Sequence, residues 1–276
     1  LRAYHYRGSN QIKLVHTLLV DSALNHDGLS ELSIRFKIGL HGPLYRRFVA
    51  FPPEQFKRKV EEREVMYSQP LIARRPINTH VMDSVSRDMI NKIAKWDDFR
   101  LLQLTSNGYT IRKRATHESP WIGTREGFRN NGIVAVGDDD GFVSFALRDF
   151  WQSSPSSLTV EGVRGDTATV ILGIYAPEAE TFNFAHYDTV AHTLEAAYED
   201  VQPGMSTAWG IGRTTSITVS IDGSIEPDAQ LVCTPEYFHR KRAFGIWSLP
   251  TVENPRDSLI EFTIDSLMEF YNDEIS

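Results

Sequence analysis

Regular alternation of apolar and polar residues is the feature of this chain that most restricts its fold. The pattern runs through residues 32–38 and returns at residues 217–221. A period of two places every second side chain on one face of a strand, so both segments predict half-buried β-strands. Apolar-rich segments predict further strands at residues 13–20, 132–136, 142–150, 167–175 and 243–247. A length of 276 residues suits one large antiparallel β-sandwich, which is the mostly β fold that we predict.

Helical spacing of apolar residues is confined to three short segments. It predicts short helices near residues 85–96 and 190–198 and a clearer helix at residues 254–271. In the last one, Asn254 can cap the N-terminus, Pro255 suits the first turn and an apolar stripe ends at Tyr271. The segment before this helix is the plausible domain boundary. We therefore predict a sandwich domain over residues 1–249 and a linker with one helix over residues 250–276.

Composition and motifs exclude several kinds of partner and cofactor. The net charge of −7 argues against nucleic acid as a partner. No stretch approaches the roughly 18 apolar residues of a transmembrane helix, so no membrane contact is predicted. Cys233 is the only cysteine and is expected to be buried, which excludes an internal disulfide. No nucleotide-binding or metal-binding motif is present, so no cofactor and no metal are predicted.

Three consecutive aspartates, residues 138–140, lie between Gly137 and Gly141 and between two predicted strands. Tight turns favour Asp and Gly for backbone reasons, so the segment predicts a hairpin turn. The same carboxylates could bind calcium, but the turn alone accounts for them.

Negative charge on the whole chain would repel a polyanionic substrate unless a local basic patch overcame it. The candidate patches are the arginine pairs at residues 46–47 and 74–75 and the RKR run at residues 112–114. Each is alternatively a set of surface ion pairs at a strand edge.

Polar loops rich in aromatic residues point to carbohydrate. They hold the blocks LRDFWQ at residues 147–152, HYDT at residues 186–189 and YEDVQPG at residues 198–204. Aromatic rings stack on sugar faces, while arginine, carboxylate and amide groups bind hydroxyls and carboxylates directionally. Alternatively, Phe150 and Trp151 belong to the core and Arg148 forms a local ion pair with Asp149.

The amino-acid sequences of these blocks, and the order in which they occur, resemble those of the rhamnogalacturonan exolyases and the related YetA-like bacterial proteins. The first matching blocks are HTLLVD at residues 16–21 and LSIRF at residues 32–36, which match the family's paired strands. The match continues through WDDFR at residues 96–100, YTIRKR at 109–114, LVCTPEYFH at 231–239 and FGIWSLP at 244–250. The resemblance therefore covers nearly the whole chain.

The resemblance implies an architecture and an activity. Family members combine an N-terminal β-barrel, a central β-sandwich and a C-terminal α/α toroid, and this chain matches the central part. It is expected to be a module whose last helix leads toward the toroid, with pectic polysaccharide or oligosaccharide as the other partner. The implied activity is cleavage of rhamnogalacturonan by β-elimination, outside the cell.

A uronate lyase needs a base for the C5 proton, a stabiliser for the charged carboxylate and an acid for the leaving oxygen. The candidate catalytic residues are Arg148, His186 and Tyr198. The candidate substrate-binding residues are Asp149, Trp151, Gln152, Tyr187 and Arg213. Structural roles are the alternative for two of these residues, because His186 could hydrogen-bond Asp188 and Tyr198 could pack on the sandwich.

Three functions follow from this pattern. The first is the sandwich module of the lyase, which we expect to be inactive alone because the toroid usually holds much of the catalytic set. The second is a non-catalytic carbohydrate-binding or structural module that supports a separate catalytic domain. The third, ranked low, is a glycoside hydrolase that uses Asp149 with Glu199 or Asp200.

Overall fold

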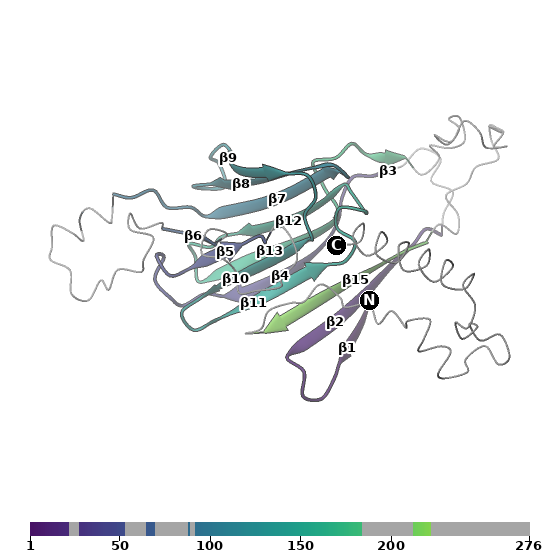
Figure 1. Cartoon of the computed structure of the whole chain (residues 1–276), viewed down its shortest axis with the longest axis horizontal. Coiled ribbons are helices and arrows are strands. Elements are labelled where there is room, and N and C mark those ends of the chain that lie inside the picture. Colours follow the sequence, from purple (N-terminus) through teal and green to yellow (C-terminus); the bar gives the residue numbers. More distant parts are fainter. Residues whose placement is uncertain (22–27, 53–64, 70–87, 89–91, 184–211, 222–276) are drawn as a thin grey trace, which may run out of the picture. The chain divides into compact units, whose positions relative to one another are not determined.

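A computed structural model describes residues 1–21, 28–52, 65–69, 88, 92–183 and 212–221 of the chain (Figure 1). The chain divides into two units, Leu1–Pro227 and Asp228–Ser276. All described residues belong to the first unit. The predicted strand at 243–247, the helices at 190–198 and 254–271, the boundary at 249/250 and Cys233 lie outside the described residues.

One layer is a seven-stranded antiparallel sheet with the order β1-β2-β15-β11-β10-β5-β6. Its strands, in that order, are Arg2–His5, Gln11–Leu19, Gly212–Ile221, Gly141–Leu147, Ile133–Asp138, Phe48–Ala50 and Val65–Tyr67. The late strand β15 lies between the early strand β2 and the central strand β11 (Figure 1).

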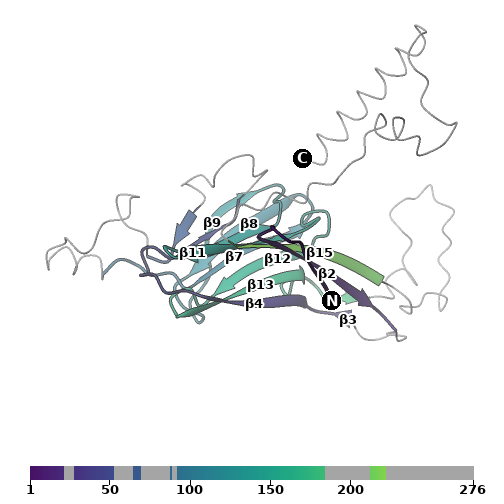
Figure 2. The same cartoon turned by 90° about the horizontal axis from the view of Figure 1, so that it is seen from below.

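The other layer is a six-stranded antiparallel sheet with the order β4-β13-β12-β7-β8-β9 (Figure 2). Its strands, in that order, are Leu32–Gly39, Thr167–Tyr175, Ser156–Glu161, Asp98–Thr105, Gly108–Arg114 and Ile122–Gly127. A small third sheet pairs β3, Gly28–Leu29, with β14, Phe182–Asn183.

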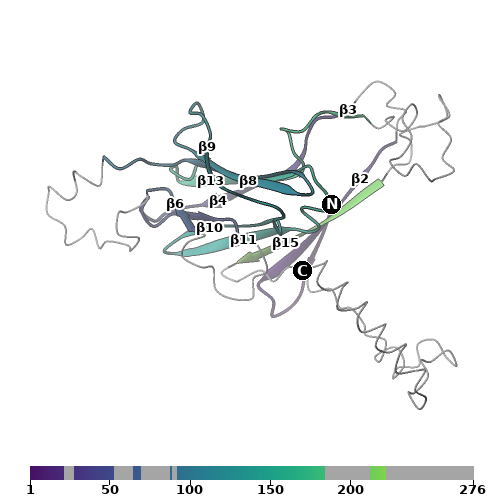
Figure 3. The same cartoon turned by 45° about the horizontal axis from the view of Figure 1, so that its top comes forward.

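The hydrophobic core lies between the two large sheets, which Figure 3 shows as two stacked layers. Phe36 of β4 and Phe145 of β11 meet across the layers with ring centroids 4.8 Å apart. Val170 and Leu158 of the six-stranded sheet and Val136 of the seven-stranded sheet are fully buried in the same cluster. The predicted mostly β sandwich is therefore confirmed.

Several predicted elements are confirmed within the described residues. Strand β13 has the predicted limits, β4 and β15 contain the alternating segments, and Gly137–Gly141 joins β10 to β11 as a hairpin. None of the described residues belongs to a helix with the length and apolar character needed to cross a membrane.

Three predictions need correction. The strand predicted to reach residue 150 ends at Leu147, because Asp149 adopts a positive φ of 55° and turns Phe150 into the core.

The segments at 16–21 and 32–36 do not pair with each other, since β2 pairs with β1 and β15 while β4 pairs with β13. Trp96 is not helical: its amide donates to the Ser68 carbonyl at 2.7 Å, and its ring packs against the core. The rest of the predicted helix at 85–96 lies mostly outside the described residues.

Candidate functional site

The loop from residue 148 to residue 155, here called the 148–155 loop, leaves β11 at the end of the sandwich. Phe150 anchors it with a side chain that is 1% exposed in the core. The Ser153 amide donates to the Asp149 carbonyl at 2.8 Å, and the Ser154 amide donates to the Trp151 carbonyl at 3.3 Å. These contacts give the loop a defined shape. Phe150 belongs to the core, which was the alternative to a role in binding sugar.

Four of the predicted site residues lie on this loop. Arg148 forms an ion pair with the neighbouring Asp149, with 3.5 Å between Nε and Oδ2. The backbone amide of Arg148 donates to the Ser216 carbonyl of β15 at 3.1 Å. Trp151 is half-buried and Gln152 is exposed. The loop therefore presents a cation, a carboxylate, an indole ring and an amide close together.

Arg213 joins this group from a distant part of the sequence. It lies near the start of β15, and its Nη2 donates to the Ser153 carbonyl of the loop at 3.4 Å. Burial lowers the pKa of Arg213 below its usual value. An arginine nevertheless stays charged at any physiological pH, so Arg213 adds a permanent cation to the loop.

Arg129 is a member of the site that sequence reasoning missed. Its guanidinium carbon lies 4.1 Å from the centroid of the Trp151 ring, which is a close cation–π contact. Arg129 and Arg213 thus contact a loop that itself carries Arg148, and we call these three residues the arginine cluster. No sequence signal pointed to Arg129, because it is isolated in the chain and 22 positions from Trp151.

The basic patches predicted from adjacent arginines have other roles. Arg46 pairs with Asp139 at 2.9 Å, and the buried Arg47 donates to the Gly42 and Val163 carbonyls at 2.6 and 3.0 Å. Arg114 is buried in an ion-pair network. Residues 74–75 lie outside the described residues.

His186, Tyr187 and Tyr198 also lie outside the described residues. The chain re-enters the described structure at Gly212, one position before Arg213.

His16 is another titratable residue near Arg213 that sequence reasoning did not select. The register of β2 and β15 pairs His16 with Thr215 and Leu18 with Arg213. Arg213, Thr215 and Ile217 alternate onto one face of β15, so His16 and Arg213 are diagonal neighbours on that face. Burial, with the positive charge of the N-terminus, lowers the pKa of His16, so its imidazole is neutral at pH 7.

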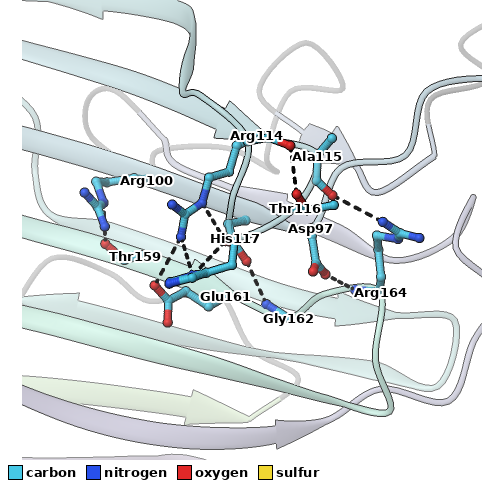
Figure 4. A network of polar contacts seen from close by, with 12 residues as sticks. Asp97, Arg100, Arg114, Ala115, Thr116, His117, Thr159, Glu161, Gly162 and Arg164 are labelled. Atoms are coloured by element: carbon cyan, nitrogen blue, oxygen red, sulfur yellow. Dashed lines mark hydrogen bonds and ion pairs between the residues drawn. The ribbon is translucent and has the colours of Figure 1, made fainter.

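A second polar cluster lies on the outer side of the six-stranded sheet (Figure 4). Asp98, His117 and Glu161 have potential metal-ligand atoms within 4.8 Å of one another. Arg114 already lies among them, however. Its Nε donates to Asp98 at 2.7 Å, its Nη2 lies 2.7 Å from His117 Nδ1, and the same Nη2 is 3.8 Å from Glu161.

This network has a structural explanation. Asp98, Arg114 and Glu161 belong to β7, β8 and β12, and Asp98 Oδ1 also accepts the Gly162 amide at 3.0 Å. The Trp121 ring packs near the guanidinium groups of Arg100 and Arg114, at 4.5 and 4.3 Å. A cation in the form of Arg114 therefore already neutralises the carboxylates, and the cluster ties three strands together.

The aspartate turn is likewise built from protein contacts. Asp138 Oδ2 accepts the amides of His41 and Gly42 at 2.7 and 2.8 Å, and Oδ1 accepts the Asp140 amide at 2.9 Å. Burial works to raise the pKa of Asp138, but these hydrogen bonds together outweigh it and lower the pKa. The carboxylate of Asp138 thus closes the turn that the sequence predicted.

The sequence of this chain is similar to those of known proteins. Residues 1–233 match the PcRGLX-like protein central beta sandwich domain, and residues 228–276 match the PcRGLX-like protein C-terminal alpha/alpha toroid domain. The chain is also 27% identical over 303 aligned residues to the "Uncharacterized protein YetA" of Bacillus subtilis (strain 168). That alignment covers 100% of this chain and 34% of the relative, so the chain spans about a third of the relative's length.

Proposed function

Because the chain belongs to the PcRGLX-like protein family, we propose that it is the sandwich module of a polysaccharide lyase. The complete protein would cleave the backbone of rhamnogalacturonan, a pectic polysaccharide, by β-elimination. Such a polymer is too large to enter a cell intact, so we propose that the protein acts outside the cell.

The arginine cluster is the observation that carries this proposal. β-Elimination removes a proton beside a carboxylate, and the negative charge that develops there must be stabilised. Guanidinium groups bind carboxylates through two parallel hydrogen bonds, and they keep their charge when partly buried. Three of them around the 148–155 loop create a local excess of positive charge on a chain whose net charge is −7. That excess favours an anionic sugar.

The base of the reaction belongs to the same proposal. His186 and Tyr198 remain candidates from the sequence. His16 is a third, because it is neutral and lies on the same strand face as Arg213. A neutral imidazole can take the C5 proton while Arg213 holds the carboxylate of the same sugar.

A non-catalytic module is the second candidate, and specific contacts favour it. Arg148 is paired with Asp149, and Arg129 covers one face of the Trp151 ring. A sugar would have to displace these partners or use the remaining surface of the loop. A module that contacts sugar weakly, or only supports the toroid, has no need to displace them.

The decisive experiment compares this chain with a protein that carries the same module and a complete toroid domain. Rhamnogalacturonan is supplied to both, and the unsaturated uronate product is followed by ultraviolet absorbance. We expect turnover by the longer protein and little or none by the chain alone, since losing part of a catalytic set costs orders of magnitude. No turnover by the longer protein would overturn the lyase proposal.

The arginine cluster is tested in the longer protein with Arg213→Lys, which keeps the charge but loses the planar pair of donors. We expect kcat/KM to fall by about 100-fold, as for the loss of one donor to a developing anion. Arg35→Lys is the matched control, because Arg35 is exposed and belongs to the other sheet. Equal activity of the two variants would place the carboxylate elsewhere.

A further inference from the structure

The outer face of the seven-stranded sheet is buried, although the main core lies on its other face. Register places four small residues in one row across neighbouring strands: Ala50 of β5, Ala135 of β10, Ser144 of β11 and Ser220 of β15. They alternate with core residues along each strand, so the row faces away from the core. None of the four is more than 3% exposed. An antiparallel sheet commonly leaves its outer face to solvent, so this face needs a cover.

A small apolar cluster lies beside the row on the same face. Ile133 of β10 and Ala146 of β11 are directly opposite each other, and they form a buried cluster separate from the main core. A pair of this size is buried only if another side chain packs on it. The cover therefore brings at least one apolar side chain to β10 and β11.

Ser220 gives a second and independent sign of the cover. Its side chain is fully buried, yet its Oγ has no hydrogen-bond partner. Buried hydroxyl groups in folded proteins normally have a partner. Because the row consists of small residues, a backbone crossing it can come close enough to supply that partner.

The chain directly after β15 is the segment best placed to cover this face. The Ile221 amide donates to the Asn10 carbonyl at 3.1 Å, and Asn10 Nδ2 donates to the Ile221 carbonyl at 3.0 Å, which fixes the end of β15. Residues 222–227 follow with the sequence DGSIEP. They lie outside the described residues but belong to the same unit as the sheet. The match to the sandwich domain also continues past β15, to residue 233.

The sequence and length of this segment fit the face. Asp-Gly is a strong turn signal, so residues 222–223 predict a reversal of the chain at the end of β15. Neighbouring strands lie about 4.8 Å apart, so Ala135 is roughly 10 Å from Ser220 across the sheet. The four residues after the turn span about 13 Å when extended. Ile225 is the only large apolar residue among the six, and this length carries it over β11 and β10.

We infer that residues 222–227 fold back across the outer face of the seven-stranded sheet. Ile225 packs on the cluster of Ile133 and Ala146, and the backbone of the segment bonds Ser220 Oγ. The segment forms a third layer over β15, β11 and β10, and it fixes the point at which the chain leaves the sandwich. This inference is independent of the proposed function.

Disulfide trapping in the full chain tests the position of Ile225. All variants carry Cys233→Ser, because Cys233 is the only native cysteine. We expect Ile225→Cys to form a disulfide under mild oxidation with Ser144→Cys or with Ala135→Cys, since bonded cysteines need Cα atoms within about 7 Å. Ser157→Cys is the matched control partner, because Ser157 is also 3% exposed but belongs to β12 of the other sheet. Peptide mass spectrometry identifies the linked pairs.

Two outcomes of the trapping overturn the inference. If neither partner on β10 or β11 links to position 225, the segment lies elsewhere. If Ser157→Cys links equally well, the segment is not held on this face.

Thermal unfolding gives a second test that needs no cysteine. Ile225→Asp would bury a charge against apolar residues, so we expect the thermal midpoint to fall by about 5 °C or more. Ser224→Asp, at the adjacent polar position, is the control and should leave the midpoint nearly unchanged. Equal midpoints for the two variants would show that Ile225 does not cover the sheet.

Discussion

Among single residues, charged side chains divide into those that hold the fold and those around the 148–155 loop. Arg47 and Arg114 are buried, and they bind carbonyls or carboxylates of neighbouring strands and loops. Arg129, Arg148 and Arg213 contact a surface loop through an indole ring, an exposed carboxylate and one long hydrogen bond. A ligand can compete for the second group much more easily than for the first.

The buried pair of Arg114 and Asp98 should dominate stability among the ion pairs. Arg114→Met would leave Asp98, whose side chain is 3% exposed, as an unpaired buried charge. We expect the free energy of unfolding to fall by about 3–5 kcal/mol. Arg35→Met removes an exposed i,i+4 pair with Glu31 and should cost less than about 1 kcal/mol. Urea unfolding measures both, and equal losses would contradict a structural role for the network.

Asp138 should make stability sensitive to acid. Its pKa in the folded chain lies below the ordinary value of 3.8, so folding binds the ionised form more strongly. The stabilisation is complete above that value and is lost as the pH falls through the lower folded pKa. We expect Asp138→Asn to unfold with a shallower dependence on pH below about 4 than the wild-type chain. Asp139→Asn, at an exposed surface pair, serves as control and should keep the wild-type slope.

Among secondary-structure elements, the connections at one end of the sandwich carry the candidate site. The segment between β9 and β10 brings Arg129, the 148–155 loop brings Trp151, and the start of β15 brings Arg213. Strands fix where each connection begins, while a few turn residues fix its shape. Altering those turn residues should therefore test the site without touching a functional side chain.

Gly132 is the most sensitive of these turn residues. It has a positive φ of 68°, and a Cβ there would approach the Phe150 side chain to 2.3 Å. Gly132→Ala therefore strains the backbone and displaces a core ring, which should cost about 2 kcal/mol or more. Gly123→Ala on β9 meets no atom within 4 Å and should stay within about 0.5 kcal/mol of wild type. Thermal unfolding of the two variants measures both losses of stability. A Gly132→Ala variant as stable as the wild-type chain would show that the turn adapts to the extra methyl group.

For the molecule as a whole, the sandwich has a core of its own within Leu1–Pro227. The family match changes from the sandwich domain to the toroid domain over residues 228–233. A domain with its own core folds independently of a neighbour.

Deleting residues 254–276 should therefore leave the sandwich folded. We expect the far-ultraviolet circular dichroism of the shortened chain to keep its β signal, with a thermal midpoint close to that of the full chain. A cooperative loss of the β signal on deletion would show that the C-terminal segment completes the sandwich core.

Local sequence patterns determined the fold class because the residues of a half-buried strand alternate between apolar and polar whatever strands it pairs with. That signal revealed β4, β13 and β15, and the Gly-Asp run revealed the hairpin. It did not reveal β7, because Asp98 and Gln103 are polar yet buried, with hydrogen-bond partners on β8 and in the connection between β9 and β10. Ordered matches along the chain likewise determined the family, since many short blocks in one order rarely coincide by chance.

Tertiary structure alone decided which charged residues come together. Adjacent arginines such as Arg46 and Arg47 suggested a basic patch, but the strands direct them to separate structural contacts. The cluster that does form draws Arg129 and Arg148 from two connections and Arg213 from the start of β15, three places far apart in the sequence. The register of β15 between β2 and β11 brings Arg213 to the 148–155 loop, and register depends on pairing with distant strands, which no local pattern specifies.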